Sequence, residues 1–212
     1  MDREAWNQRY ADAELVWSAE ANRFLVQEVA DLPPGRALDL GAGEGRNAIW
    51  LAERGWRVTA VDFSGIGLQK ARRLAEARGV EVNWTEADLR SYSPARGAFE
   101  LVVLVYIHLP GDERRAVVRR AADAVAAGGT LLVVGHDRSN LEEGYGGPQD
   151  PTILFTPDDI TEDLAGIEEL HVVRADRVVR PVVTEDGERN AIDALVRAER
   201  RSMDGDARRS AS

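Results

Sequence analysis

The chain has no cysteine and only 3 histidines. Without cysteine there is no disulfide framework, no thiolate nucleophile and no cysteine-based metal site. A basic excess is also missing, because 27 Lys and Arg face 37 Asp and Glu and the formal net charge is −10. Nucleic-acid binding depends on basic surface patches, so this charge disfavours DNA and RNA as partners. It leaves room for a small anionic substrate held by one or two local arginines.

Long apolar runs are absent as well. No stretch approaches the roughly 20 apolar residues that a membrane-spanning helix requires, and the polar start "MDREAWNQRY" has no apolar run to serve as a signal peptide. We therefore expect a cytoplasmic protein without a membrane partner, as a monomer or homodimer. Its 212 residues, 44% of them hydrophobic, suit one domain with a full core. We place that domain at 1–201 and a flexible polar tail at 202–212.

Residues 36–137 alternate between short apolar strands and amphipathic helices. Strands are predicted at 36–41, 56–62, 80–88, 99–109 and 130–137. Helices are predicted at 44–55, 65–79 and 112–129, the last ended by a glycine pair. This order predicts a mostly parallel sheet with helices on both faces.

The C-terminal part departs from that alternation. Segments 167–180 and 189–201 flank Asp186-Gly187, a hairpin turn signal, and we interpret them as antiparallel strands. The second segment could instead be a helix, because Ala, Glu and Arg are good helix formers.

The connection at 140–159 is long and rich in Gly and Pro, as lids and binding loops often are, although it could be a plain surface connection. Its Tyr145 and Phe155 could contact an apolar substrate, and Thr156 begins a helix with Pro157 at its first position.

The turn Gly41-Ala42-Gly43-Glu44-Gly45 joins the first strand to the following helix. A dinucleotide fingerprint, G-x-G-x-x-G, would need its third glycine where Arg46 stands. The carboxylates of Asp39 and Glu44 would also repel a pyrophosphate. A cofactor with a cationic amino group and no phosphate, such as S-adenosylmethionine, suits this turn better.

Further candidate binding residues lie beyond the carboxyl ends of the next strands, where ligands of open α/β sheets bind. Asp62 ends the second strand, at a position where an acid can accept both ribose hydroxyls of an adenosine. Asp88, next to Leu89, ends the third strand and can accept the adenine amino group. The segment "VLVYIHLP" leaves the fourth strand at the same edge.

Four motifs in this order resemble those of class I S-adenosylmethionine-dependent methyltransferases: "LDLGAGEGRN", "AVDFS", "EAD" and "GGTLLVVGHD". The likeness spans residue 36 to about residue 201, including the final hairpin. The opening "WNQRY" is similar to that of the small tellurite-resistance and thiopurine methyltransferase-like group. The resemblance implies a Rossmann-like, doubly wound sheet of seven mostly parallel strands ending in an antiparallel hairpin. It also implies that the helices of 1–31 form a cap or lid.

The resemblance and the strand-end pattern together predict the cofactor contacts. S-adenosyl-L-methionine would bind there and S-adenosyl-L-homocysteine would leave, and Arg46 and Asn47 would lie near the methionine end. The aromatic residues of 1–31 could cover the sulfonium by cation–π contact or only pack onto the sheet, and Phe63 and Leu89 could likewise be plain core. The predicted cofactor residues are Asp39, Gly41, Ala42, Gly43, Arg46, Asn47, Asp62, Phe63, Ser64, Asp88, Leu89, Val105, Trp6, Tyr10 and Trp17.

Three side chains are candidates to face the methyl acceptor. Tyr106 and His108 follow the fourth strand and His136 ends the fifth, so a histidine could act as general base. His171 lies inside a late strand, where a packed or exposed role is expected. We find no residue set typical of a metal-dependent methyltransferase, and therefore predict no metal. The Asn/Asp-Pro-Pro-Tyr/Phe motif is missing after the fourth strand, which disfavours methylation of DNA bases.

These observations predict methyl transfer to a small molecule through an oxygen, nitrogen, sulfur or chalcogen nucleophile. Two alternatives stay open at this point. An NAD(P)-dependent oxidoreductase would use the same kind of sheet, and a protein could bind S-adenosylmethionine without catalysis, because few catalytic side chains are obligatory for methyl transfer.

Overall fold

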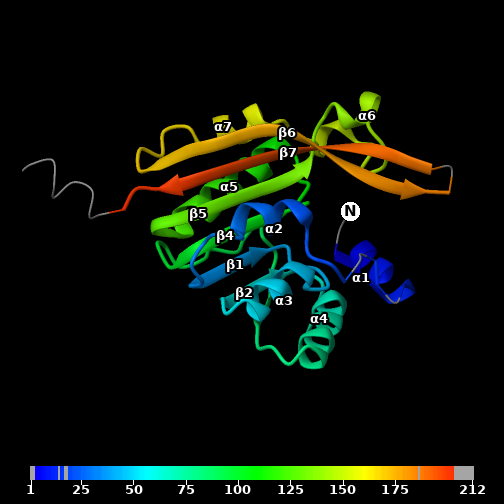
Figure 1. Ribbon diagram of the computed structural model, residues 1–212, viewed down its shortest axis with the longest axis horizontal. Coiled ribbons are helices and arrows are strands. Elements are labelled where there is room, and N and C mark those ends of the chain that lie inside the picture. Colours follow the sequence, from blue (N-terminus) through cyan, green and yellow to red (C-terminus); the bar gives the residue numbers. More distant parts are fainter. Residues whose placement is uncertain (1–2, 14, 17–18, 186, 203–212) are drawn as a thin grey trace, which may run out of the picture.

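A seven-stranded sheet in the order β3-β2-β1-β4-β5-β7-β6 organises the chain (Figure 1). The computed structural model describes residues 3–13, 15–16, 19–185 and 187–202. Five strands are parallel and the last two run antiparallel to their neighbours, so the predicted fold class is confirmed. The strands are β1 (Arg36–Leu40), β2 (Arg57–Asp62), β3 (Asn83–Glu86), β4 (Phe99–Val105), β5 (Val125–His136), β6 (Leu170–Thr184) and β7 (Gly187–Arg200).

Helices cover both faces of this sheet. One face carries α2 (Arg23–Val29) and α3 (Arg46–Glu53), and the other carries α5 (Gly111–Ala124) and α7 (Pro157–Leu164). Helix α4 (Gly65–Ala77) packs near β3, and α1 (Arg3–Asp12) packs against α4 beyond the carboxyl ends of the strands (Figure 1).

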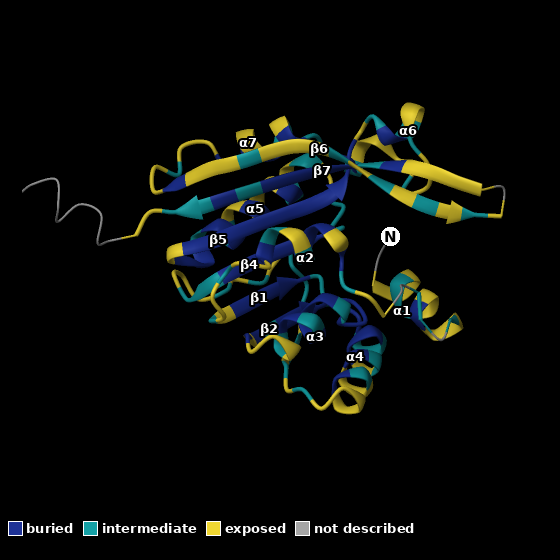
Figure 2. Cartoon of the chain, viewed as in Figure 1, coloured by how far each residue is buried: buried dark blue, intermediate teal, exposed yellow. Residues whose placement is uncertain are grey.

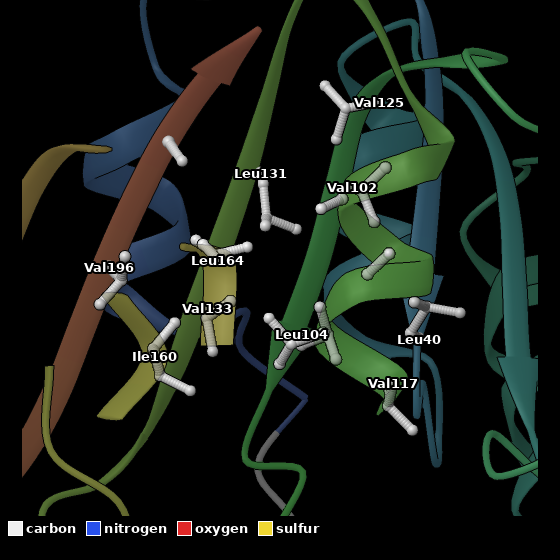
Figure 3. Close-up of a cluster of buried hydrophobic side chains, with 14 of the residues drawn as sticks. Leu40, Val102, Leu104, Val117, Val125, Leu131, Val133, Ile160, Leu164 and Val196 are labelled. Carbon is white, nitrogen blue, oxygen red and sulfur yellow. The ribbon is translucent and has the colours of Figure 1, made fainter. Parts of the chain in front are cut away.

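The central strands alternate between two apolar clusters. Leu38 and Leu104 join α5 and α7, in the cluster that Figure 3 shows, whereas Ala37 and Leu101 join α2 and α3. Successive side chains of a strand point to opposite faces. Strands buried on both faces therefore read as continuous apolar runs, as the sequence predicted.

Three predicted boundaries were wrong. β4 ends at Val105, because Tyr106 adopts φ +60° and turns the chain out of the sheet before the expected end at 109. α5 ends at Ala124, where Val125 is already extended, so the glycine pair lies inside β5. β3 stops at Glu86, and Asp88 lies in a turn that its own carboxylate closes with the Arg90 N–H.

The hairpin prediction is confirmed and the helical alternative for 189–201 is wrong. β7 pairs with β5 over Thr130–His136 and with β6 along its length, with Gly187 opposite Thr184. Asp186 lies outside the described residues. The far end of the hairpin extends past β5 and is exposed on much of its surface (Figures 1 and 2).

The predicted loop at 140–159 is partly helical. It contains α6 (Asn140–Glu143) and a 3₁₀ turn at Pro151–Ile153. Thr156 caps α7 as predicted, in a reciprocal pair of hydrogen bonds with Asp159. The proposed substrate contact of Phe155 was wrong: this ring is fully buried in the core, where any Cβ on Gly135 would collide with it. No helix in the described ranges has the length and apolarity to span a membrane.

Candidate active site

A cavity of about 860 Å³ opens at the carboxyl ends of the parallel strands. Its wall combines the turn after β1, the ends of β2, β4 and β5, the N-terminal segment and residues 180–182 of the hairpin. Small-molecule sites commonly occupy about 300–1,000 Å³. This volume is near the upper end of that range and suits a cofactor together with a second small molecule.

The glycine turn forms the floor of the cavity. Gly41, Gly43 and Gly45 have φ values of +80°, +55° and +81°, which L-residues with a Cβ rarely adopt. A Cβ at Gly43 would also lie 2.6 Å from the Tyr10 hydroxyl. The turn is therefore bare backbone, as the sequence predicted, and a ligand can approach it closely.

Asp62 fastens this turn to the end of β2. One carboxylate oxygen accepts the Gly43 N–H and the other accepts the Ser64 N–H, both at 2.8 Å. Burial raises the pKa of Asp62. The residue lines the cavity while only 6% exposed. Because a carboxylate has about four lone-pair sites, Asp62 retains acceptor capacity for ribose hydroxyls.

Two predicted cofactor residues do not line the cavity, and a third lies outside the described residues. Asp39 lies beneath the turn, 1% exposed, and burial followed by repulsion from Asp62 raises its pKa to about 7. Ser64 is buried as the N-cap of α4, where it accepts the Gly67 N–H. Trp17 is the residue outside the described ranges. We expect Asp39 and Ser64 to support the turn without touching a ligand.

The role that the sequence argument gave to Glu44 was wrong. Its carboxylate lies 3.2 Å from Lys70 Nζ and accepts the Val16 N–H at 3.0 Å. The negative charge is therefore compensated, so it does not make the turn acidic. Glu44 instead ties the N-terminal segment to α4.

The N-terminal segment lies over the glycine turn. Trp6 and Tyr10 share a face of α1, with ring centroids 5.4 Å apart, and both line the cavity. Asn47, at the start of α3, accepts the backbone N–H of Asn22. Trp6 and Tyr10 thus line the cavity while α1 packs against α4, and contact of either ring with a sulfonium stays a prediction.

The end of the cavity near β3 presents Phe63, Asp88 and Leu89. Asp88 forms a bidentate pair with Arg90, whose Nη2 lies 2.6 Å from one carboxylate oxygen. This hydrogen bond is the main cause that lowers the pKa of Asp88. Arg90 was not predicted from the sequence, and an adenine amino group would have to share Asp88 with it.

Tyr106, His108 and His136 come together at the opposite end of the cavity. The ring centroids of Tyr106 and His136 lie 4.9 Å apart, and those of the two histidines 5.2 Å apart. All three line the cavity. Tyr106 has the only positive φ among the described non-glycine residues, and such strained conformations cluster at functional sites.

A buried carboxylate, Asp193 of β7, holds this cluster from behind. It accepts the Tyr106 hydroxyl at 2.9 Å and Arg180 Nε at 2.7 Å, and it is 0% exposed. His136 Nδ1 lies 3.1 Å from its other oxygen, without the alignment of a hydrogen bond. Burial, and next the negative charge of Asp193, raises the pKa of Tyr106, so this phenol stays protonated and is no base.

His108 is unsuited to be the general base. Its Nε2 accepts the backbone N–H of His136 at 3.2 Å, which occupies the lone pair that a base would use. Burial, and next the neighbouring His136, lowers the pKa of His108 to about 3. We therefore interpret His108 as a neutral support for His136. His171 is exposed on β6, one of its two expected environments.

Comparison with known proteins points to methyltransferases, as the glycine turn does. Residues 37–129 match the family described as "Methyltransferase domain". Demethylmenaquinone methyltransferase of Thermus thermophilus is 35% identical over 124 residues, which are 58% of this chain and 54% of that relative. Residues 37–129 therefore carry the sequence pattern of a methyltransferase domain. Proteins of this family use S-adenosylmethionine. The chain spans only about half the length of the Thermus thermophilus relative.

Solved structures show the same fold over nearly the whole chain. A structure from work on the conversion of a disulfide bond into a thioacetal group during echinomycin biosynthesis has a TM-score of 0.76. It is 22% identical and covers 99% of this chain and 96% of its own. TehB from Haemophilus influenzae has a TM-score of 0.72 at 16% identity, covering 94% of this chain and 67% of its own. The predicted likeness to the tellurite-resistance group is therefore confirmed for the fold.

The residues that the hairpin adds to the cavity were not predicted from the sequence. Arg180 lines the cavity and Asp193 supports it from behind. One signal could have found Asp193, because it is a charged residue within an apolar stretch of the last strand. Ile107 was also missed; its side chain packs against Gly41. Among the described residues, no group of three or more His, Asp or Glu is placed to hold a metal ion.

Proposed function

We propose that this protein transfers the methyl group of S-adenosylmethionine to a small-molecule nucleophile: an oxygen, nitrogen, sulfur or chalcogen atom. The observation that carries the proposal is a single cavity that extends from the glycine turn to His136 and Tyr106. A relative at 35% identity is a demethylmenaquinone methyltransferase, whose name indicates a small-molecule acceptor. The charge of −10 favours such an acceptor over a nucleic acid.

The residues of the cavity fit the parts of the cofactor. Asp62 would accept the ribose hydroxyls, and Asp88 with Leu89 would face the adenine. The N–H groups of the Gly41 to Gly43 turn donate within the protein, so the bare surface of this turn and the adjoining start of α3 would lie against the methionine part, with Asn47 beside it. Trp6 and Tyr10 would cover the sulfonium, where aromatic rings stabilise a cation.

Methyl transfer from a sulfonium is an in-line displacement. The lone pair of the acceptor attacks the methyl carbon, the carbon–sulfur bond breaks, and S-adenosylhomocysteine leaves with the bonding electrons. The cofactor is already activated, so the protein mainly aligns the reactants and excludes water. When the nucleophile carries a proton, His136 would take it, and Asp193 would orient and stabilise the resulting imidazolium.

The alternatives are weaker than this proposal. A nicotinamide cofactor would need the third fingerprint glycine, and Arg46 stands there at the start of α3. The family match gives that alternative no support. Binding of the cofactor without catalysis would leave the cluster of Tyr106, His136 and Asp193 without a role.

Calorimetric titration tests the cofactor site first. We expect S-adenosylmethionine and S-adenosylhomocysteine to bind the native protein, and Asp62→Ala to lose roughly 1.5–3 kcal/mol, about tenfold or more in affinity. Because Asp62 also holds the turn, unfolding of the variant is measured alongside, and the exposed Asp31→Ala serves as the charge-matched control. Failure of the native protein to bind either compound would refute the cofactor assignment.

Transfer of a labelled methyl group into a panel of small thiols, phenols and amines tests catalysis. His136→Gln is expected to lower kcat while leaving cofactor affinity unchanged, because His136 lies at the acceptor end. Full activity of this variant on every acceptor would remove His136 from the mechanism. Silence across the whole panel, with the cofactor bound, would count against methyl transfer to these classes.

A further inference from the structure

The cavity wall is rich in arginine, although the chain as a whole is acidic. Among the described residues, its charged side chains include three acids, Glu44, Asp62 and Asp88, against a larger number of arginines. The arginines are Arg9, Arg23, Arg46, Arg78, Arg90 and Arg180. The whole sequence carries a formal net charge of −10. The local excess of arginine in the cavity wall therefore favours binding of an anionic ligand.

Two of these arginines are supported by carboxylates that do not themselves line the cavity. Arg180 Nε lies 2.7 Å from Asp193, which is 0% exposed. Asp39, 1% exposed beneath the glycine turn, attracts Arg46 electrostatically. A ligand in the cavity therefore meets the guanidinium groups, whereas the compensating carboxylates stay behind the wall.

Both arginines line the cavity, and Arg180 reaches its acceptor end. The guanidinium of Arg180 lies over the Tyr106 ring, 5.5 Å from its centroid. Burial lowers the pKa of Arg46, and the positive charge of Arg180 contributes to lowering it. Holding like charges together in a buried wall is costly, and an anion between them would offset that cost.

We propose that Arg46 and Arg180 form a binding site for a carboxylate group of the methyl acceptor. The inference rests on the proposed function and adds the class of acceptor: a small organic acid whose nucleophile reaches His136 when its carboxylate contacts the two arginines. The planar donors of arginine match the two oxygens of a carboxylate. The methionine carboxylate of the cofactor has the same chemistry, and Arg46 lies toward the cofactor turn. Arg180 is therefore the residue that separates the two sources.

The test measures binding of matched probes by calorimetry, with S-adenosylhomocysteine at saturation. The probes are hydroxybenzoates and mercaptoalkanoates of several lengths, each paired with its primary amide. We expect the carboxylates to bind the native protein at least about tenfold more tightly than the amides, the scale of one charge-assisted hydrogen bond. Arg180→Gln should remove that preference. Arg36→Gln, which removes an arginine paired with Glu100 away from the cavity, should keep it.

A second titration identifies which carboxylate the site holds. Native protein and Arg180→Gln are compared with S-adenosylhomocysteine and its decarboxylated analogue. The inference requires the variant to bind both with native affinity. A loss of affinity for S-adenosylhomocysteine alone would show that Arg180 holds the cofactor carboxylate, and would overturn it. Equal binding of acids and amides by the native protein would overturn it as well.

Titrations with and without S-adenosylhomocysteine distinguish a failure of the proposed function from a failure of this inference. If S-adenosylhomocysteine does not bind, the methyl-transfer proposal fails, and the probe titrations are then run without it. Preference for the carboxylates, lost in Arg180→Gln, supports the anion site in either condition. Its absence in both conditions overturns the site whatever the cofactor result.

Discussion

The buried carboxyl group of Asp39 makes the stability of this domain depend on pH. Asp39 is 1% exposed, and its pKa is raised from 3.8 to about 7. The folded state thus holds this proton more tightly than the unfolded state does. The contribution of Asp39 to stability is fully present below about pH 4 and is lost as the pH rises toward 7 and beyond. A neutral residue at this position removes that loss.

The magnitude follows from the difference of about three pKa units between folded and unfolded states. At about 1.36 kcal/mol per unit, full ionisation of Asp39 costs at most about 4 kcal/mol of unfolding free energy. Between pH 5.5 and 8.5 the same two pKa values give a change of about 2 kcal/mol. Asp39→Asn keeps the shape of the side chain and abolishes the titration. We expect the native protein to lose about 2 kcal/mol relative to this variant across that interval.

Urea unfolding followed by tryptophan fluorescence measures this difference at each pH. The asparagine itself can shift stability by a constant amount, so the prediction concerns only the change of the difference with pH. Asp31→Asn, at an exposed position, is the control and should run parallel to the native protein. A difference between the native protein and Asp39→Asn that stays constant from pH 5.5 to 8.5 would refute the idea that a desolvated carboxyl group titrates beneath the turn.

Substitutions at three further positions test local packing, one in the glycine turn and two at α7. Gly45→Ala should lower the unfolding free energy by about 1–3 kcal/mol, because its backbone has φ +81° and the new Cβ would lie 2.6 Å from the Trp84 ring; unchanged thermal unfolding would contradict this. Asp163→Ala should cost about 3–5 kcal/mol in urea unfolding, because it leaves Arg114 buried without its partner at 2.7 Å; a cost near zero would show that the ion pair is dispensable. Thr156→Ala should lower the unfolding free energy by about 1 kcal/mol, because the helix cap is lost. Thr156→Ser should retain most of the stabilisation that the cap provides.

The end of the cavity proposed to hold the cofactor could be predicted from the sequence, because its residues follow directly from strand ends. Parallel strands place their carboxyl ends at one edge of the sheet, so a glycine turn after the first strand and acids after the next two must lie near one another. Predicting Gly43, Asp62 and Asp88 required only the strand order and no knowledge of side-chain packing. Each of these predictions was reliable because it depended only on residues close together in the sequence.

Predictions failed where a titratable side chain had a partner far away in the sequence. Glu44 looked like an unbalanced charge beside the turn, but Lys70 compensates it. His108 looked like a base, but its lone pair accepts a hydrogen bond from the backbone of His136. Neither partner is implied by local spacing, because each depends on how a helix or a turn packs after the sheet has formed.

The acceptor side depends on the register of an antiparallel pair. His136 of β5 stands directly opposite Asp193 of β7, and opposite residues in adjacent strands point to the same face. A shift of one residue would turn Asp193 to the other face and leave His136 and Arg180 without their buried partner. The same hairpin carries Arg180 to the cavity wall. The parallel half of the sheet thus positions the groups proposed to hold a cofactor, and the register of the final antiparallel strand positions those proposed to face the methyl acceptor.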